Sequence, residues 1–190
     1  QIAFLKDPSN DNGAGFFVLQ DTFNQNGPAT WRLWLPRDSL ALDTNSARSR
    51  TPGGGDLDIQ FAAPRGVELT TTTQTRTCPG LLPDGRTDVQ MPTTQTALIA
   101  SAENVSRFSV LLDPRDRSSL PAAVTSLGEG RGMRVERGGE TATVFLSPEP
   151  WSYSQAGVSF EGTCGVVRVT DKEVTLSLGS GGRISAEGRT

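Results

Sequence analysis

The chain has 190 residues, a net charge of -3, a pI near 5.0 and no histidine. Its 18 lysine and arginine residues are scattered, whereas nucleic-acid binding needs concentrated basic side chains, so no nucleic-acid partner is expected. The absence of imidazole also argues against most proton-transfer and metal chemistry near neutral pH. We therefore expect a protein that binds, braces or assembles, and no catalytic residue is assigned.

Apolar and polar residues alternate along nearly the whole chain, and Gly, Pro, Asn and Asp interrupt them at short intervals. This pattern predicts antiparallel strands joined by tight turns, and no segment predicts a helix. The expected fold is an all-β antiparallel sandwich of stacked sheets that ends in a hairpin meander. The predicted strands are residues 2–6, 16–20, 30–35, 57–62, 67–73, 93–102, 107–112, 122–126, 133–137, 143–147, 158–162, 166–170, 173–178 and 183–186.

The clearest of these elements is a hairpin near the C-terminus, where Asp171 and Lys172 form a short turn between two alternating strands. Residues 179–182 predict a second tight connection, because glycine tolerates the positive φ of a primed turn. Two long polar stretches, residues 36–55 and 78–92, read as loops that either line a binding surface or are mobile excursions. A charged link at residues 115–119 predicts that residues 1–114 form the main portion of the sandwich and that residues 115–190 form a C-terminal meander packed on it. The alternative is a single domain that spans residues 1–190.

Composition also bears on location. No run of about 18 apolar residues occurs, so no membrane span is expected. Lysine is scarce while Thr, Ser, Gly and Pro are abundant, as in many exported β-proteins. We expect an extracellular or periplasmic protein whose export signal has been removed or lies upstream. In such a compartment Cys78 and Cys164 either form a disulfide that closes a long loop or remain two buried thiols.

One segment suggests a metal site. Asp7, Ser9 and Asp11 place oxygen ligands at alternate positions, as calcium loops do. The EF-hand pattern also needs glycine at its sixth position and glutamate at its twelfth, where this chain has Asn12 and Val18. A polar turn explains the same residues better, and an irregular calcium site is the weaker alternative. No other cofactor is expected.

Tryptophan and arginine suggest a glycan site. A flat indole face complements the apolar face of a sugar, and arginine pairs with carboxylate or sulfate. Trp31 and Trp34 are three apart in a predicted strand, so they point to opposite faces and at least one is expected in the core. The candidate glycan-binding residues are Trp31, Arg32, Trp34, Arg37, Arg48, Arg50 and Arg86.

Three further patterns have plain structural explanations. Asp56 and Asp58 lie on one face of a predicted strand and could form a paired acid site, but a solvated polar face gives the same pattern. Trp151 and Tyr153 share a face and could close an edge of the sandwich. Asn104 begins an Asn-Val-Ser sequon, which matters only if the source organism glycosylates. No serine-hydrolase elbow with a partner histidine occurs.

Several segments of the sequence show a resemblance to a known protein family. Residues 1–8 (QIAFLKDP), 15–23 (GFFVLQDTF) and 30–34 (TWRLW), followed by 127–135 (LGEGRGMRV), 144–147 (VFLS) and 158–168 (VSFEGTCGVVR), resemble the C-terminal β-domain of heparinase II/III-like polysaccharide lyases. The resemblance spans most of the chain and rests on strand and turn patterns. It implies stacked antiparallel sheets, an upstream helical toroid as a partner, and an acidic polysaccharide in the cleft between them.

Active members of that family remove the C5 proton of a uronic acid with tyrosine and histidine, and this chain has no histidine to match. The leading hypothesis is therefore a non-catalytic module that binds or positions an acidic polysaccharide. One alternative is a structural, self-assembling extracellular β-protein that associates through its sheet edges. The other is a fragment of an active lyase whose toroid lies on another segment.

Overall fold

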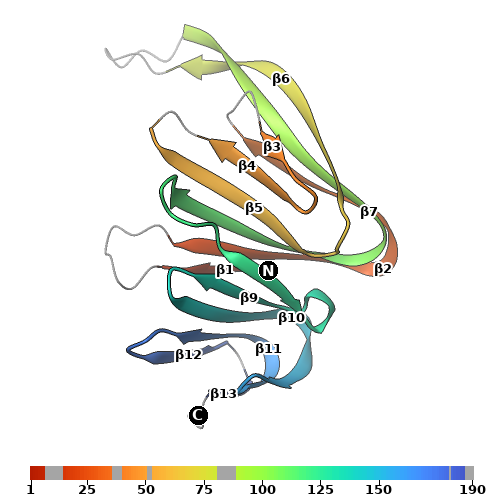
Figure 1. Cartoon of the computed structure of the whole chain (residues 1–190). Coiled ribbons are helices and arrows are strands. Elements are labelled where there is room, and N and C mark those ends of the chain that lie inside the picture. The colour runs from red at the N-terminus through yellow and green to blue at the C-terminus, as the bar shows by residue number, and fades with distance from the viewer. Residues whose placement is uncertain (7–14, 36–39, 51–52, 81–88, 180, 187–190) are drawn as a thin grey trace.

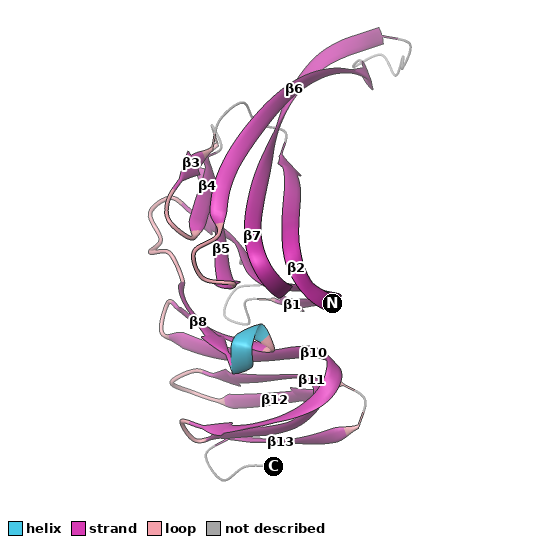
Figure 2. Ribbon diagram, turned by 90° about the vertical axis from the view of Figure 1, so that its right-hand side faces the viewer, coloured by secondary structure: helices cyan, strands magenta, loops and turns pink. Residues whose placement is uncertain are grey.

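The computed structural model describes residues 1–6, 15–35, 40–50, 53–80, 89–179 and 181–186. In these ranges the chain forms thirteen strands, and its one helical element is a single 3-10 turn, η1 (Gly128–Gly130). The strands belong to a seven-stranded sheet, here sheet A, and a six-stranded sheet, here sheet B, with antiparallel pairing throughout (Figures 1 and 2). The predicted all-β antiparallel class is confirmed.

Sheet A is built around one long strand. Its members are β1 (Ile2–Leu5), β2 (Phe16–Leu35), β3 (Ala41–Leu42), β4 (Ser46–Arg50), β5 (Gly55–Ala63), β6 (Glu68–Gly80) and β7 (Val89–Asp116). The order is β1-β2-β7-β5-β4-β3, and β6 also pairs with β7. One edge of β7 pairs with β2, while the other pairs first with β6 and then with β5. The sheet curls as a result, as Figure 2 shows.

Several predicted strands are halves of longer, bent ones. Residues 16–20 and 30–35 both belong to β2, and residues 93–102 and 107–112 both belong to β7. The pairing of β2 with β7 shifts register on both sides of Gly27, and Asn104 has a φ of 53° at the same bend. Bulges of this kind let a ladder continue around a corner, so a polar, Asn-rich segment that reads as a loop stays in the sheet.

The two polar stretches predicted as loops are corrected in part. Residues 36–55 contain β3 and β4, and β4 pairs in register with β5 from Ser46↔Gln60 to Arg50↔Asp56. Because Ala47 and Ser49 are small and buried while their neighbours are charged, the apolar signal of this strand is weak. In the second stretch, β6 runs to Gly80 and β7 begins at Val89, and residues 81–88 lie outside the described ranges.

Sheet B contains the C-terminal strands. They are β8 (Ala123–Leu127), β9 (Gly132–Arg137), β10 (Glu140–Gln155), β11 (Val158–Val169), β12 (Val174–Leu178) and β13 (Gly182–Ala186), in the order β12-β11-β10-β9-β8. The predicted β11–β12 hairpin is confirmed, with Val169 opposite Val174. The next connection does not make a hairpin, because β13 pairs with the first half of β11. Gly182 permits this approach, since a Cβ there would collide with the Glu161 carbonyl oxygen.

Three apolar clusters hold the fold together. The first joins the sheets, with Leu5, Phe16 and Val18 of sheet A against Met133 and Val144 of sheet B. The second lies inside the curl of sheet A and the third inside sheet B. Figure 1 shows β1 beside β9 and β10, where the sheets meet.

The chain passes from one sheet to the other close to the predicted link at residues 115–119, because β7 ends at Asp116 and β8 begins at Ala123. Whether the two parts are separate domains stays a prediction. Among the described residues, no helix is long and apolar enough to cross a membrane.

Candidate functional site

The best candidate for a glycan site is a strip on the outer face of sheet A, opposite its apolar cluster. Directly paired residues share a face, so the register of β2, β7 and β6 aligns Arg32 with Ile99 and Thr70, and Trp34 with Ala97 and Thr72. One pair further along, Thr30 faces Ser101, and their hydroxyl oxygens lie 3.4 Å apart. The outer strip is defined as Thr30, Arg32, Trp34, Thr70, Thr72, Ala97, Ile99 and Ser101, and the exposed carboxylate of Glu68, paired with Ser101, bounds it at one end.

The outer strip combines the groups that bind acidic sugars. Trp34 is 37% exposed and Arg32 is exposed beside it on the same face. Thr70 and Thr72 are exposed on β6 and add hydroxyl groups. An indole face stacks on an apolar sugar face, hydroxyls exchange hydrogen bonds with sugar hydroxyls, and a guanidinium binds a carboxylate or sulfate with two parallel hydrogen bonds.

Trp31, in contrast, belongs to the core. It is 7% exposed and packs edge to face against Phe61, with the ring centroids 5.3 Å apart. The prediction that Trp31 and Trp34 point to opposite faces, with at least one in the core, is confirmed. Trp31 is therefore not available to a glycan, and only Arg32 and Trp34 of the predicted residues on β2 come together at the surface.

Arg48 and Arg50 lie away from the outer strip, on β4. Both line a hollow of about 340 Å³ together with Asp58, Gln60 and Ala122. The guanidinium of Arg48 donates hydrogen bonds to both carboxylate oxygens of Asp58, and this pairing raises the pKa of Arg48. Arg48 thus already has an anionic partner within the chain, whereas Arg50 is exposed at the rim.

Asp56 and Asp58 do share a face, as predicted, but this face is buried and ion-paired. Asp58 is 3% exposed, and Arg115 Nε lies 2.6 Å from its Oδ2. Burial opposes ionisation of Asp58, but hydrogen bonds from Arg48 and Arg115 outweigh it and lower its pKa. Arg117 donates to Asp56 Oδ1 at 3.2 Å. Both carboxylates are paired with arginines, so the alternative prediction of a solvated polar face is wrong.

A third carboxylate beside this network, Asp113, is less well compensated. It is fully buried, and neither of its oxygens accepts a hydrogen bond of good geometry from the described residues. Arg137 Nε lies 3.4 Å from Oδ1. Burial therefore raises the pKa of Asp113, and the charge of Arg137 and the backbone N–H of Ala122 offset only part of the effect.

Several predicted residues lie outside the described ranges: Arg37, Arg86 and the possible calcium ligands Asp7, Ser9 and Asp11. Within the described ranges, no group of three or more acidic or thiol side chains is placed to hold a metal ion. Cys164 is a half-buried free thiol in β11. Cys78 belongs to β6 of the other sheet, and its side chain is outside the described set; because Cys164 is free, it forms no bond with Cys78 in this structure, unlike the disulfide alternative considered from the sequence.

The single tyrosine lies in an aromatic cluster of sheet B. The Tyr153 ring is 5.4 Å from Phe145 and 6.0 Å from Trp151, and Phe145 stacks on Phe160 at 4.3 Å. Packing at these distances is typical of a sheet core. Trp151 and Tyr153 thus contribute to the fold of sheet B.

Sequence reasoning missed two arginines that come near each other where the sheets join, namely Arg107 and Arg131. Their segments do not look basic, because the strands bring them together from distant positions. The one available signal was the alternation Gly128, Gly130, Gly132, which marks a tight backbone approach.

Comparisons with protein-family models, with curated proteins and with solved structures each found no match. The fold and the site therefore define a class and no more: an all-β protein of two packed antiparallel sheets.

Proposed function

We propose that this chain is a non-catalytic β-module that binds an acidic polysaccharide along the outer strip. The observation that carries the proposal is the exposed indole of Trp34 beside the exposed guanidinium of Arg32 on a face rich in hydroxyl groups. A sheet face of this kind offers an extended surface to a polymer, and a uronate repeat supplies both an apolar ring face and a carboxylate. The resemblance to the β-domain of heparinase II/III-like lyases points to the same class of ligand.

The direct test is affinity electrophoresis of the purified chain in gels that contain alginate, heparin or chondroitin sulfate, with neutral dextran as the control polymer. We expect retardation by at least one acidic polymer and none by dextran. Because Arg32 is exposed, added salt should weaken the binding by screening its charge. A chain that no uronate polymer retards contradicts the proposal.

Two variants locate the surface. W34A removes the stacking face, which is worth about 0.5–1.5 kcal/mol, and should weaken binding by up to about tenfold. R32Q should reduce both the affinity and its salt dependence. Matched controls are L178A, at a residue with the same 37% exposure as Trp34, and R183Q, at an exposed arginine of sheet B. Equal losses in the controls would place the binding surface elsewhere.

One observation favours a second candidate, self-assembly. Ile2 and Phe4 on β1 are 70% and 56% exposed, and Phe4 contacts the partly exposed Phe17 of β2 with their ring centroids 4.7 Å apart. Adjoining exposed apolar side chains on an edge strand favour association between molecules. Light scattering at rising concentration should then show oligomers that F4S abolishes, whereas a persistent monomer excludes this function.

A further inference from the structure

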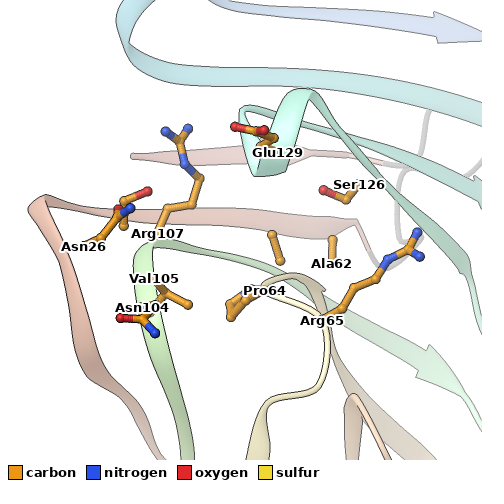
Figure 3. Close-up of a pocket in the computed structure, with 11 residues that line it drawn as sticks. Asn26, Ala62, Pro64, Arg65, Asn104, Val105, Arg107, Ser126 and Glu129 are labelled. Atoms are coloured by element: carbon orange, nitrogen blue, oxygen red, sulfur yellow. The ribbon is translucent and has the colours of Figure 1, made fainter.

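A hollow of about 390 Å³ lies at the junction of the two sheets (Figure 3). It is lined by β2, the turn after β5, the bend of β7, β8 and η1, so both sheets are needed to form it. Its size falls within the range of about 300–1,000 Å³ that is usual for small-molecule sites. Its polar lining includes Asn26, Asn104, Ser106, Arg107, Ser126 and Glu129.

Arg107 is the residue of this hollow with a side-chain nitrogen that no described residue pairs. Figure 3 shows its side chain rising from β7 toward η1, beside Glu129, while Arg65 points away. The Nη1 atom of Arg107 is buried and has no hydrogen-bond partner in the described part of the chain. Because Nη1 itself is closed off from solvent, a ligand in the hollow would contact Arg107 through the accessible part of this half-buried side chain, and the orphaned Nη1 marks a guanidinium that the described residues leave short of acceptors.

The charges around Arg107 leave its positive charge largely uncompensated. Burial and repulsion by Arg131 lower the pKa of Arg107, and attraction to Glu129 offsets only part of this effect. Guanidinium groups nevertheless remain protonated at neutral pH. The hollow therefore carries a persistent positive charge that a bound anion would neutralise.

The backbone of η1 holds Arg107 in place without using its guanidinium. Gly128, Glu129 and Gly130 have φ values of 53°, 57° and 86°, a left-handed turn that Gln20 fixes by donating a hydrogen bond to the Gly130 carbonyl. A Cβ on Gly130 would lie 3.0 Å from Arg107 Cδ, so the stem of the arginine rests against this glycine. The stem of Arg107 is thus held in position before a ligand binds.

We propose that this junction pocket binds the carboxylate of a sugar acid through Arg107. A carboxylate matches the planar guanidinium fork, and the amide and hydroxyl groups of Asn26, Asn104, Ser106 and Ser126 suit the hydroxyls of the ring. The site is separate from the outer strip, and the inference does not require that the strip bind a polymer.

The probe is D-glucuronate, titrated into the full chain by isothermal calorimetry and thermal shift, with D-glucose and inorganic sulfate as comparison ligands. Glucuronate should bind and raise the melting temperature, whereas glucose lacks the carboxylate and should do neither. Sulfate tests the alternative of a simple anion site. Absence of glucuronate binding, or an equal response to sulfate, overturns the proposal.

Three variants identify the contact. R107M should weaken glucuronate binding by about tenfold or more without lowering the melting temperature of the unliganded protein, because it also removes an unpaired buried charge. R107K, which keeps the charge but loses the fork, should bind more weakly than the wild type. E129Q removes the competing carboxylate and should tighten binding. Unchanged affinity in both R107M and E129Q excludes the site.

Two controls separate this proposal from the proposed function. R183M changes an exposed arginine of sheet B and should leave glucuronate binding intact. W34A should reduce polymer retardation and leave glucuronate binding unchanged, whereas R107M should weaken glucuronate binding and leave polymer retardation unchanged. Loss of glucuronate binding in W34A would mean that the sugar acid occupies the outer strip, and it would refute the junction pocket.

Discussion

Replacing Asp58 by asparagine removes the carboxylate that two arginines share on β5 of sheet A. Arg48 and Arg115 both donate to it, and the Arg115 side chain is only 3% exposed. Asparagine keeps the shape of the side chain but not its charge. The D58N variant therefore leaves a buried guanidinium without its main counter-ion.

The expected cost follows from this geometry. Removing one partner of a buried ion pair costs roughly 3–5 kcal/mol. Arg115 keeps Asp56 at 3.9 Å, and the Arg48 side chain is 32% exposed and regains water. Both features favour the lower end of that range, about 3 kcal/mol. At about 2–4 °C per kcal/mol for a chain of this size, the melting temperature of D58N should fall by about 6–12 °C.

Calorimetry at pH 7 measures this loss, and its pH dependence tests the cause. The pKa of Asp58 is lowered in the fold, so its stabilisation is present above the ordinary aspartate value of about 3.9 and is lost as the pH falls through its folded value. The wild-type and D58N melting temperatures should therefore converge below about pH 3.9. D171N, at an exposed turn position, is the control. A D58N melting temperature within about 2 °C of the wild type at pH 7 would refute the reasoning.

Three further outcomes are expected. D113N should lower the free energy of unfolding by less than about 1 kcal/mol, or should raise it. Because burial raises the pKa of Asp113, the stability of D113N relative to the wild type should be greater at pH 7 than at pH 4, as calorimetry can show. G128A should destabilise by about 1–3 kcal/mol and shift the tryptophan fluorescence, since Gly128 has a φ of 53° and a Cβ there would collide with Trp151. G179A should destabilise by a similar amount, because its methyl group meets the Cys164 sulfur, and in a double-mutant cycle C164A should recover much of the loss in urea unfolding.

The sequence predicted the class of fold because period-two alternation survives in most of the strands. The predicted strand boundaries were wrong where a strand bends or carries little apolar surface. β2 continues through the polar residues around Gly27 because its partner β7 bends with it, and that partner is not visible from local sequence. β4 was missed because its inward residues are Ala47 and Ser49, which give almost no hydrophobic signal.

The candidate site was predictable to the extent that it depends on alternation along one strand. That Trp31 and Trp34 point to opposite faces follows from their spacing, and so does the shared face of Arg32 and Trp34. Which of the two tryptophans lies in the core is settled only by the fold. The roles of Arg48 and Arg107 do not follow from local sequence, because each depends on what the fold places beside it. Asp58 faces Arg48 across the β4–β5 ladder, whereas the part of the chain that the structure describes supplies no acceptor for the buried nitrogen of Arg107.

The arginines of this protein can therefore be ranked by whether their hydrogen bonds are satisfied, and exposure alone would rank them wrongly. Arg115 is the most buried and is fully engaged, by Asp58 and by the Ser119 carbonyl, so its role is structural. Arg32 is exposed and solvated, so a ligand gains only from its position beside Trp34. Arg107 is half-buried, and its Nη1 has no acceptor among the described residues, so a carboxylate bound beside it would displace few existing partners. Per contact formed, the junction pocket should therefore discriminate a carboxylate from a hydroxyl more sharply than the outer strip does.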